Sequence, residues 1–210
     1  MTFMTTTLSA IVTYMTTLAP TSIFTILAYG LWGICFAYWI IAAFHTKRTK
    51  SIPKRGEQIV ATVLIAIGFT LVFYRHVIPV PFGAQLFTPG PLIGMLGVLL
   101  TLLGVTWALL AREALGVNWS GAVVTIKEDH QLIESGPYAY VRHPIYAGFL
   151  LGALGTVFTI GTLASFCAIP ILLIAFAIRI RREEKMMLAQ FPDTFRAYKF
   201  RTKMLIPRLF

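Results

Sequence analysis

The stretch IYAGFLLGALGTVFTIGTLASFCAIPILLIAFAI, residues 145–178, decides the fold, because none of its 34 consecutive residues is charged. A membrane-spanning helix needs about 20 apolar residues. The stretch is therefore too long for one span and falls short of two full spans joined by a loop. The Gly161-Thr162 pair near its middle is the best turn signal. The sequence thus predicts a tight helical hairpin, with helices over residues 145–160 and 163–180.

Glycines recur along the first helix of this hairpin and at its turn. They are Gly148, Gly152, Gly155 and Gly161. A glycine has no side chain to hold backbones apart, and small residues are enriched where membrane helices pack closely. We therefore expect these glycines to let the two helices of the hairpin approach each other.

Three further apolar runs precede the hairpin, over residues 23–44, 58–74 and 91–111, and each is bounded by charge, Pro or Gly. Only 12% of the chain is charged, against about 25% in a soluble domain, and its mean hydropathy is +0.77. This composition excludes a soluble globular protein, a disordered chain and a secreted disulfide scaffold. Cys35 and Cys167 lie in apolar runs and are expected to be packing residues. The predicted fold class is an all-α integral membrane protein with five transmembrane helices.

The basic residues predict the orientation of these spans. A five-span chain places 17 of its 18 Lys and Arg residues on one side and leaves Arg75 alone on the other. Cytoplasmic loops carry such an excess, so the N-terminus is expected outside and the C-terminus inside. The net charge of +10 is explained by topology, and no nucleic-acid partner is expected. Residues 1–24 lack the basic region of a signal peptide, so no cleavage is expected.

Two polar segments, residues 112–144 and 179–210, flank the hairpin and therefore lie at the same membrane face. The first ends in Gly136-Pro-Tyr-Ala-Tyr-Val-Arg-His-Pro-Ile-Tyr146, and the second begins Arg179-Ile-Arg-Arg-Glu-Glu184. Interfacial anchoring explains a single Tyr or Arg, and an i, i+4 ion pair explains Arg179 with Glu183. The density of the first motif and the carboxylates at a membrane boundary instead favour a binding site.

The first polar segment also contains an alternating apolar pattern around a charged turn, Lys127-Glu-Asp129. Residues 123–126 precede this turn and residues 130–133 follow it. Alternation of this kind around a polar turn is typical of a β-hairpin. The sequence therefore predicts a short hairpin on the membrane surface.

The Gly136–Tyr146 motif, the helical hairpin, Glu183-Glu184 and the Phe191, Phe195 and Tyr198 that follow together resemble the isoprenylcysteine carboxyl methyltransferase family. That family belongs to a wider group of membrane methyltransferases that includes phospholipid N-methyltransferases. The resemblance covers about residues 118–207. The family usually has Phe-Gly before a Tyr-x-x-Tyr pair, whereas this chain has Phe191-Pro192 and then Phe195. The departure affects substrate contacts more than cofactor binding.

The resemblance implies an S-adenosylmethionine-dependent methyltransferase with a cytoplasmic cofactor pocket. Its expected acceptor is a lipidic or prenylated molecule in the membrane, and the favoured reaction is O-methylation of a prenylcysteine-like carboxylate. It divides the single membrane domain into a three-span region, 1–111, and a cofactor-binding region with the hairpin, 112–210. Arg179 matches a substrate-associated, catalytic position. The implied cofactor-binding residues are His130, Gln131, Leu132, Ile133, Tyr138, His143, Pro144, Ile145, Tyr146 and Glu183.

The chemistry of these residue types agrees with the resemblance. The aromatic faces of Tyr138 and Tyr146 suit an adenine or a sulfonium. Glu183 suits ribose hydroxyls or an ammonium, and His143 can donate to a carboxylate. The guanidinium of Arg179 favours a carboxylate acceptor over an amine lipid. No metal site is expected, and no Gly-rich dinucleotide fingerprint occurs.

Three alternative functions remain open at this stage. One is a phospholipid N-methyltransferase, and another is a membrane NADPH-dependent reductase of the sterol-reductase type. The third is a non-catalytic membrane scaffold, in which the acidic pair is only a salt bridge. The reductase shares the hairpin and the cytoplasmic pocket, and it needs basic contacts to a 2′-phosphate, which the bases after Arg179 do not exclude. Calorimetric titration with both cofactors would separate the reductase from the methyltransferases.

Overall fold

The computed structural model describes residues 22–44, 49–51, 56–74, 81–119, 126–127 and 132–207 of the 210-residue chain. The predicted mostly helical fold is confirmed, and one small two-stranded sheet is added to it. In chain order the elements are α2 (Ile23–Ala43), β1 (Thr49–Ser51), α3 (Gly56–Phe73), α4 (Pro91–Leu115), the 3₁₀ helix η2 (Gly116–Asn118), β2 (Ile126–Lys127), the 3₁₀ helix η3 (Gly136–Ala139), α5 (Pro144–Ile160), α6 (Leu163–Gln190) and α7 (Pro192–Arg201).

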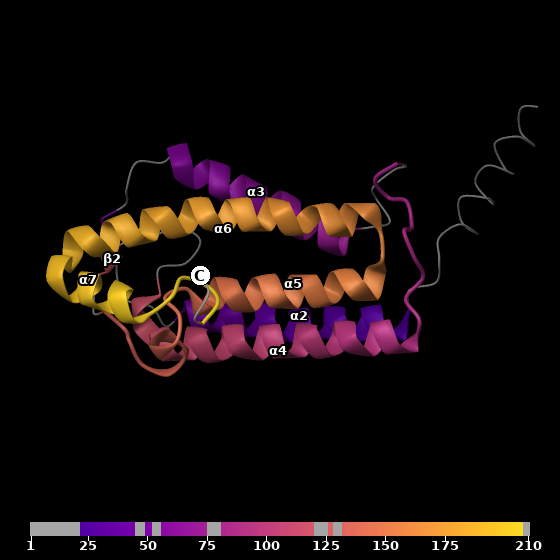
Figure 1. Ribbon diagram of the computed structural model, residues 1–210, viewed down its shortest axis with the longest axis horizontal. Coiled ribbons are helices and arrows are strands. Elements are labelled where there is room, and N and C mark those ends of the chain that lie inside the picture. The colour runs from indigo at the N-terminus through magenta and orange to yellow at the C-terminus, as the bar shows by residue number, and fades with distance from the viewer. Residues whose placement is uncertain are drawn as a thin grey trace, which may run out of the picture.

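The long helices lie in two layers (Figure 1). Helices α4 and α5 pack side by side with α2 against them, and α3 packs along α6 in the second layer. The two helices of the predicted hairpin, α5 and α6, therefore belong to different layers. The polar end of α6 extends past the start of α5 toward α7 at one end of the bundle (Figure 1).

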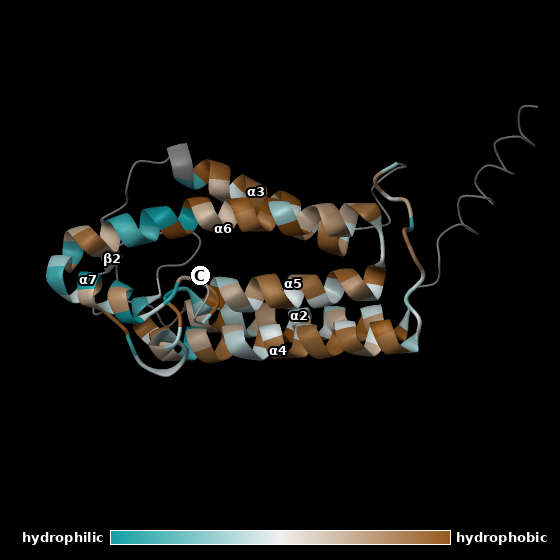
Figure 2. Cartoon of the chain, in the orientation of Figure 1, coloured by the Kyte–Doolittle hydropathy of each residue, from teal (hydrophilic) through white to brown (hydrophobic). Residues whose placement is uncertain are grey.

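Three of these helices are long and apolar enough to cross a membrane, namely Ile23–Ala43, Pro91–Asn118 and Leu163–Gln190. Two shorter apolar helices, Gln58–Phe73 and Pro144–Ile160, complete the bundle. Hydrophobic residues cover both layers along most of their length, whereas hydrophilic residues gather at the end with α7 (Figure 2). This distribution is that of a multi-pass integral membrane protein. The count of five spans stays a prediction.

Two helices run further than the charge pattern predicts. Helix α4 continues past Ala111 to Leu115 because Arg112 is buried, and its Nη1 and Nη2 donate to the carbonyls of Gly116 at 2.9 Å and Ala42 at 2.8 Å. Helix α6 continues ten residues past Ile180 to Gln190. Arg, Glu, Lys, Met, Leu and Ala are strong helix formers, so a charged residue marks the edge of an apolar run and not the end of its helix.

The predicted break of the hairpin at Gly161 is confirmed. Gly161 has φ +72°, a left-handed conformation that glycine adopts without strain. The loop before α4 fastens this turn, because the Gln85 side chain donates to the carbonyl of Ile160 at 2.7 Å and the Leu86 amide donates to Gly161 at 2.8 Å. Thr162 then caps the start of α6.

The expectation that the α5 glycines bring α5 and α6 together is wrong, because Gly148 and Gly155 meet α4 and Gly152 meets Trp32 of α2. A Cβ added at Gly104 of α4 would lie 2.3 Å from the amide nitrogen of Gly152 and 2.5 Å from the carbonyl oxygen of Gly148. A Cβ at Gly155 would lie 2.4 Å from the amide nitrogen of Thr101. Close backbone packing needs small residues on both helices. Helix α4 supplies them, whereas the sequence of α6 contains no glycine.

Replacing Gly104 by alanine is expected to destabilise the fold. The new methyl group has only backbone atoms to displace, and overpacking of this kind costs about 1–3 kcal/mol. Gly33→Ala in α2 is the matched control, because a Cβ there meets nothing within 4 Å. Reversible unfolding in mixed detergent micelles measures both free energies. Equal stability of the two variants would show that α4 and α5 do not meet as described.

The strand β2 has a partner that the sequence did not predict. Ile126–Lys127 pairs antiparallel with Thr49–Ser51, in the connection between α2 and α3. Leu132 and Ile133 are not in a strand, and residues 128–131 lie outside the described residues. The alternating pattern correctly indicates an extended segment, but it carries no information about a partner more than seventy residues away.

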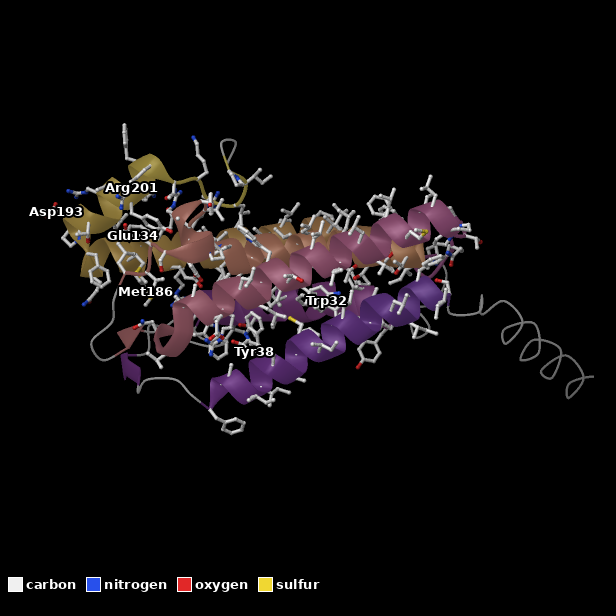
Figure 3. The ribbon with its side chains drawn as sticks, turned by 90° about the horizontal axis from the view of Figure 1, so that it is seen from below. Trp32, Tyr38, Glu134, Met186, Asp193 and Arg201 are labelled. Carbon is white, nitrogen blue, oxygen red and sulfur yellow. The ribbon has the colours of Figure 1, made fainter. Side chains whose placement is uncertain are left out.

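Trp32 lies at the centre of the bundle and joins the two layers (Figure 3). Its indole contacts the rings of Phe69 in α3 and Phe149 in α5, with centroids 5.4 and 5.7 Å away. Its Nε1 donates to Thr156 at 2.9 Å, so its one polar atom is satisfied. Cys35, one turn along α2, is buried as predicted, Cys167 is half-buried, and both cysteines are free thiols.

Candidate functional site

The two sequence motifs meet at the hydrophilic end of the bundle (Figure 2). Pro144 occupies the first turn of α5, where its missing N–H costs no hydrogen bond. His143 immediately precedes α5, and α6 continues past this point. Glu183 and Glu184 therefore come to lie beside His143. The fold thus brings together residues that lie about forty positions apart in the sequence, as the sequence predicts.

His143 lies between the two adjacent carboxylates. Its Nδ1 is 3.3 Å from Oε2 of Glu183, and its Nε2 is 3.4 Å from Oε1 of Glu184. Burial by itself lowers the pKa of His143, but hydrogen bonds to both glutamates and their charges raise it more. The net pKa therefore lies above its ordinary value. The arrangement favours an imidazolium that donates from both nitrogens.

Three donors converge on the carboxylate of Glu183. The Tyr146 hydroxyl donates to Oε1, Arg179 Nε lies 3.5 Å from the same oxygen, and His143 approaches Oε2. The Arg179–Glu183 contact is the i, i+4 ion pair considered from the sequence. Nearby cations therefore balance the charge of this carboxylate. The side chain of Glu183 is still 21% exposed, which leaves part of it open to a ligand.

Two other rings stack against the ring of Tyr146. The imidazole of His143 lies 5.8 Å from its centroid at 17°, and Phe176 lies 4.9 Å away at 20°. Both rings are nearly parallel to that of Tyr146, so part of the aromatic face that the sequence predicts for a ligand contact is already in contact with other rings. Arg179 also approaches the ring, with Cζ 5.9 Å from the centroid.

The 3₁₀ helix η3 places Tyr138 next to this cluster. Gly136 begins η3 with φ +60°. Tyr138 is buried, and its carbonyl accepts a hydrogen bond of 2.7 Å from the Tyr198 hydroxyl. Helix α7 therefore folds back onto η3. A second contact joins α7 to the segment before η3, where the more exposed Arg201 pairs with Glu134 (Figure 3).

The structure brings together most of the site residues predicted from the sequence. Pro144 is buried, Ile145 is half-buried, and both begin α5 beside the cluster. Leu132 and Ile133 are half-buried in the segment before η3, and their predicted backbone contact with a cofactor stays a prediction. His130 and Gln131 lie outside the described residues. Of the predicted residues, His143, Tyr146 and Arg179 contact the carboxylate of Glu183. Tyr138 lies in η3, just before this cluster in the sequence.

Sequence reasoning missed part of the cluster. Glu184 is buried; its Oε1 lies 2.7 Å from Nε of Arg142, and its Oε2 lies 2.5 Å from Nζ of Lys199. Glu184 was recognised from the sequence as half of the carboxylate pair, whereas Arg142 and Lys199 were not predicted as site residues. The adjacent pair Glu183-Glu184 was itself a signal. Adjacent residues of a helix point about 100° apart, so the two carboxylates cannot share all of their partners. The second carboxylate therefore needs cations of its own, which Arg142 and Lys199 supply.

Within the described ranges, no group of three His, Cys, Asp or Glu side chains is placed to hold a metal ion. The acidic residues at the hydrophilic end are instead matched by nitrogen donors. Glu183 faces His143 and Arg179, and Glu184 faces Arg142 and Lys199. The described part of the site is thus a cluster of charged hydrogen bonds that suits an organic ligand with charges of both signs.

The resemblance stated from the motifs is confirmed, because residues 95–189 match the model of the isoprenylcysteine carboxyl methyltransferase family. The chain is 36% identical over 115 residues to the protein-S-isoprenylcysteine O-methyltransferase of Saccharomyces cerevisiae, covering 54% of this chain and 48% of that protein. It is 34% identical over 122 residues to the cobalt-zinc-cadmium resistance protein CzcN of Cupriavidus metallidurans, covering 56% and 49%. A solved eukaryotic intramembrane Ras methyltransferase aligns with 24% identity and a TM-score of 0.48, over 72% of this chain and 52% of that chain. The chain spans about half the length of the curated relatives it matches.

Proposed function

From the match of residues 95–189 to the isoprenylcysteine carboxyl methyltransferase family, we propose that this chain is an S-adenosylmethionine-dependent integral membrane methyltransferase. We further propose that its acceptor is a membrane-embedded lipidic carboxylate of the prenylcysteine type, which it converts to a methyl ester. The observation that carries the proposal is the cluster in which His143, Tyr146 and Arg179 surround the partly exposed carboxylate of Glu183.

The residues of this cluster fit S-adenosylmethionine, which supplies an electrophilic methyl group on a sulfonium. Its amino-acid end carries an ammonium and a carboxylate. Glu183 offers acceptors for the ammonium or for ribose hydroxyls, and the neighbouring imidazolium of His143 offers donors for the carboxylate. An acid and a cationic donor 3.3 Å apart thus match a zwitterion. We assign the remaining contacts to His130, Gln131, Leu132, Ile133, Tyr138, Pro144, Ile145 and Tyr146.

Arg179 is the residue that we assign to the acceptor. It lies one helical turn before Glu183 and only 13% of its side chain is exposed, so its attraction for a carboxylate is poorly screened. A guanidinium can orient a carboxylate so that one oxygen faces the methyl group. That oxygen is already anionic and needs no general base. Positioning and the exclusion of water then supply the catalysis.

The proposal is tested with membranes that contain the chain and methyl-labelled S-adenosylmethionine. A farnesylated N-acetylcysteine is expected to become labelled, and mild base should release the label as methanol because the product is an ester. Phosphatidylethanolamine in the same membranes should stay unlabelled. A base-stable label in the phospholipid fraction would favour N-methylation instead. Binding of NADPH in calorimetry, with no binding of S-adenosylmethionine, would favour a reductase.

We also propose that this site faces the cytoplasm, with the N-terminus outside, because of the charge bias of the chain. In a chain without its native cysteines, Lys203→Cys is expected to react with an impermeant maleimide only after the cells are opened. Gly83→Cys is expected to react in intact cells, since the loop that contains it contacts the opposite end of the hairpin through the Ala84–Leu163 hydrogen bond. Labelling of position 203 in intact cells would contradict the orientation.

A further inference from the structure

The segment that follows α7 runs beside the residues that precede α5. Val141 and Lys203 form a parallel bridge. The Arg142 amide donates to the Lys203 carbonyl at 2.8 Å, and the His143 amide donates to the Met204 carbonyl at 3.0 Å. The C-terminal segment therefore holds the backbone of His143 directly.

A buried carboxylate ties the same segment to α6. Oε1 of Glu184 accepts from Nε of Arg142 at 2.7 Å, and Oε2 accepts from Nζ of Lys199 in α7 at 2.5 Å. Arg142 also donates through Nη1 to the carbonyls of Thr202 and Lys199. The side chains of Arg142 and Glu184 are 8% and 9% exposed. The segment before α5, helix α6 and helix α7 thus share one set of charged hydrogen bonds.

This set of contacts also fixes the ring of His143. Nε2 of the imidazole faces Oε1 of Glu184 at 3.4 Å, the oxygen that accepts from Arg142. The opposite nitrogen, Nδ1, faces Glu183. The backbone of His143 and one ring nitrogen are therefore set from the C-terminal side, which leaves the other nitrogen directed at the carboxylate that we assign to the cofactor.

We propose that Glu184, Arg142, Lys199 and the carbonyl groups of residues 202–204 form a C-terminal clasp that positions His143 for cofactor binding. The inference rests on the proposed function, because it concerns the same site. Glu184, Arg142 and Lys199 are positioning residues, since they act on the cofactor through His143. The C-terminal segment is on this account a functional part of the site.

Other ion pairs in the same region lack the features of the clasp and provide matched controls. Arg196 and Asp193 pair across one turn of α7 at 3.8 Å, with side chains 72% and 95% exposed. Such exposed pairs contribute little. Arg196→Gln thus removes a cation from α7 without touching the clasp.

Cofactor affinity and turnover, measured separately on the full-length protein in nanodiscs, test the clasp. Arg142→Gln and Glu184→Gln are each expected to raise the Kd for S-adenosylmethionine at least about tenfold, because each removes a charge from the buried pair that holds His143 in place. The turnover number at saturating cofactor should fall much less. The Kd of the double variant should be no higher than that of the single variant with the higher Kd, since both changes break the same cluster. Arg196→Gln should bind like the unaltered protein.

Tryptic cleavage after Lys203 gives a second measurement that does not depend on methyl transfer. Binding linkage is reciprocal, so S-adenosylmethionine should slow this cleavage in the unaltered protein and should slow it much less in Glu184→Gln. If Arg142→Gln or Glu184→Gln fails to fold, Arg142→Lys and Glu184→Asp take their place, with smaller losses of affinity expected.

The outcomes separate the clasp from the function on which it rests. An unaltered protein that does not bind S-adenosylmethionine overturns the proposed function and the clasp together. An unaltered protein that binds it, with single variants of equal affinity or a double variant whose losses add, overturns the clasp alone. Weaker binding in both single variants, without added loss in the double variant, supports the clasp.

Discussion

Replacing Glu183 by glutamine is expected to weaken S-adenosylmethionine binding by about 1.5–3 kcal/mol, the usual worth of hydrogen bonds to a charged group. That range corresponds to roughly a tenfold to 150-fold rise in Kd. Glutamine keeps the shape of the side chain but removes the charge that faces His143, Tyr146 and Arg179. The loss should therefore appear in cofactor affinity, and calorimetry on the purified protein measures it.

The control for this prediction is Asp193→Asn, which removes a carboxylate whose side chain is 95% exposed on α7. Its Kd should match that of the unaltered protein. An unchanged Kd in Glu183→Gln, with the control also unchanged, would leave the carboxylate cluster with a structural role only.

The same variant changes a pH dependence. The folded protein raises the pKa of His143 above its unfolded value of about 6.5. Protonated His143 therefore contributes stability that is fully present below the unfolded pKa and is lost as pH rises through the folded pKa. Cofactor affinity should decline in that window. Glu183→Gln removes one of the two charges that raise this pKa, so the decline should move to lower pH.

Replacing Arg179 by alanine is expected to abolish most methyl transfer while leaving the Kd for S-adenosylmethionine within about tenfold, or 1.4 kcal/mol. The reason is that Arg179 is assigned to the acceptor carboxylate and only borders Glu183, at 3.5 Å. Arg179→Lys keeps the charge but loses the planar fork, so partial activity should remain. Arg181→Ala, an exposed residue two positions along α6, should retain full turnover.

The competing explanation is that Arg179 serves only to hold Glu183. Methyl transfer at saturating cofactor and the cofactor Kd, measured on the same preparations, separate the two explanations. If Arg179→Ala loses cofactor affinity as severely as Glu183→Gln does, the assignment to the acceptor is refuted.

Local signals in the sequence predicted most of the bundle. The apolar runs predicted the starts of α2, α4 and α6 within a residue or two, and Gly161 was predicted as the turn. Apart from the meeting of the two segments that flank the hairpin, contacts between residues distant in the sequence were not predicted. Nothing in the spacing of Gly148 and Gly155 distinguishes α4 from α6 as their neighbour, and periodicity cannot show that Ile126–Lys127 pairs with Thr49–Ser51.

The residues of the candidate site also divide into those that the sequence predicted and those that it did not. The dense motif around His143 and the paired Glu183 and Glu184 were found because unusual residue types occur close together at a membrane boundary. Arg142 and Lys199 were missed because a single Arg or Lys at a helix end is ordinary. Their role becomes visible only when the fold places both on the buried carboxylate of Glu184.

The division of the hairpin between two layers has a mechanical consequence. Helix α5 packs chiefly on α4, and α6 chiefly on α3. Fewer contacts join α5 to α6 directly, among them the turn at Gly161, the stacking of Tyr146 on Phe176, and, at the end opposite the turn, the contacts of His143 with Glu183 and Glu184. The ion cluster thus holds α5 and α6 together at the end of the bundle opposite the turn at Gly161. A ligand that binds Glu183 or His143 competes with the contacts between them. Ligand binding and the separation of α5 from α6 at this end are therefore thermodynamically linked.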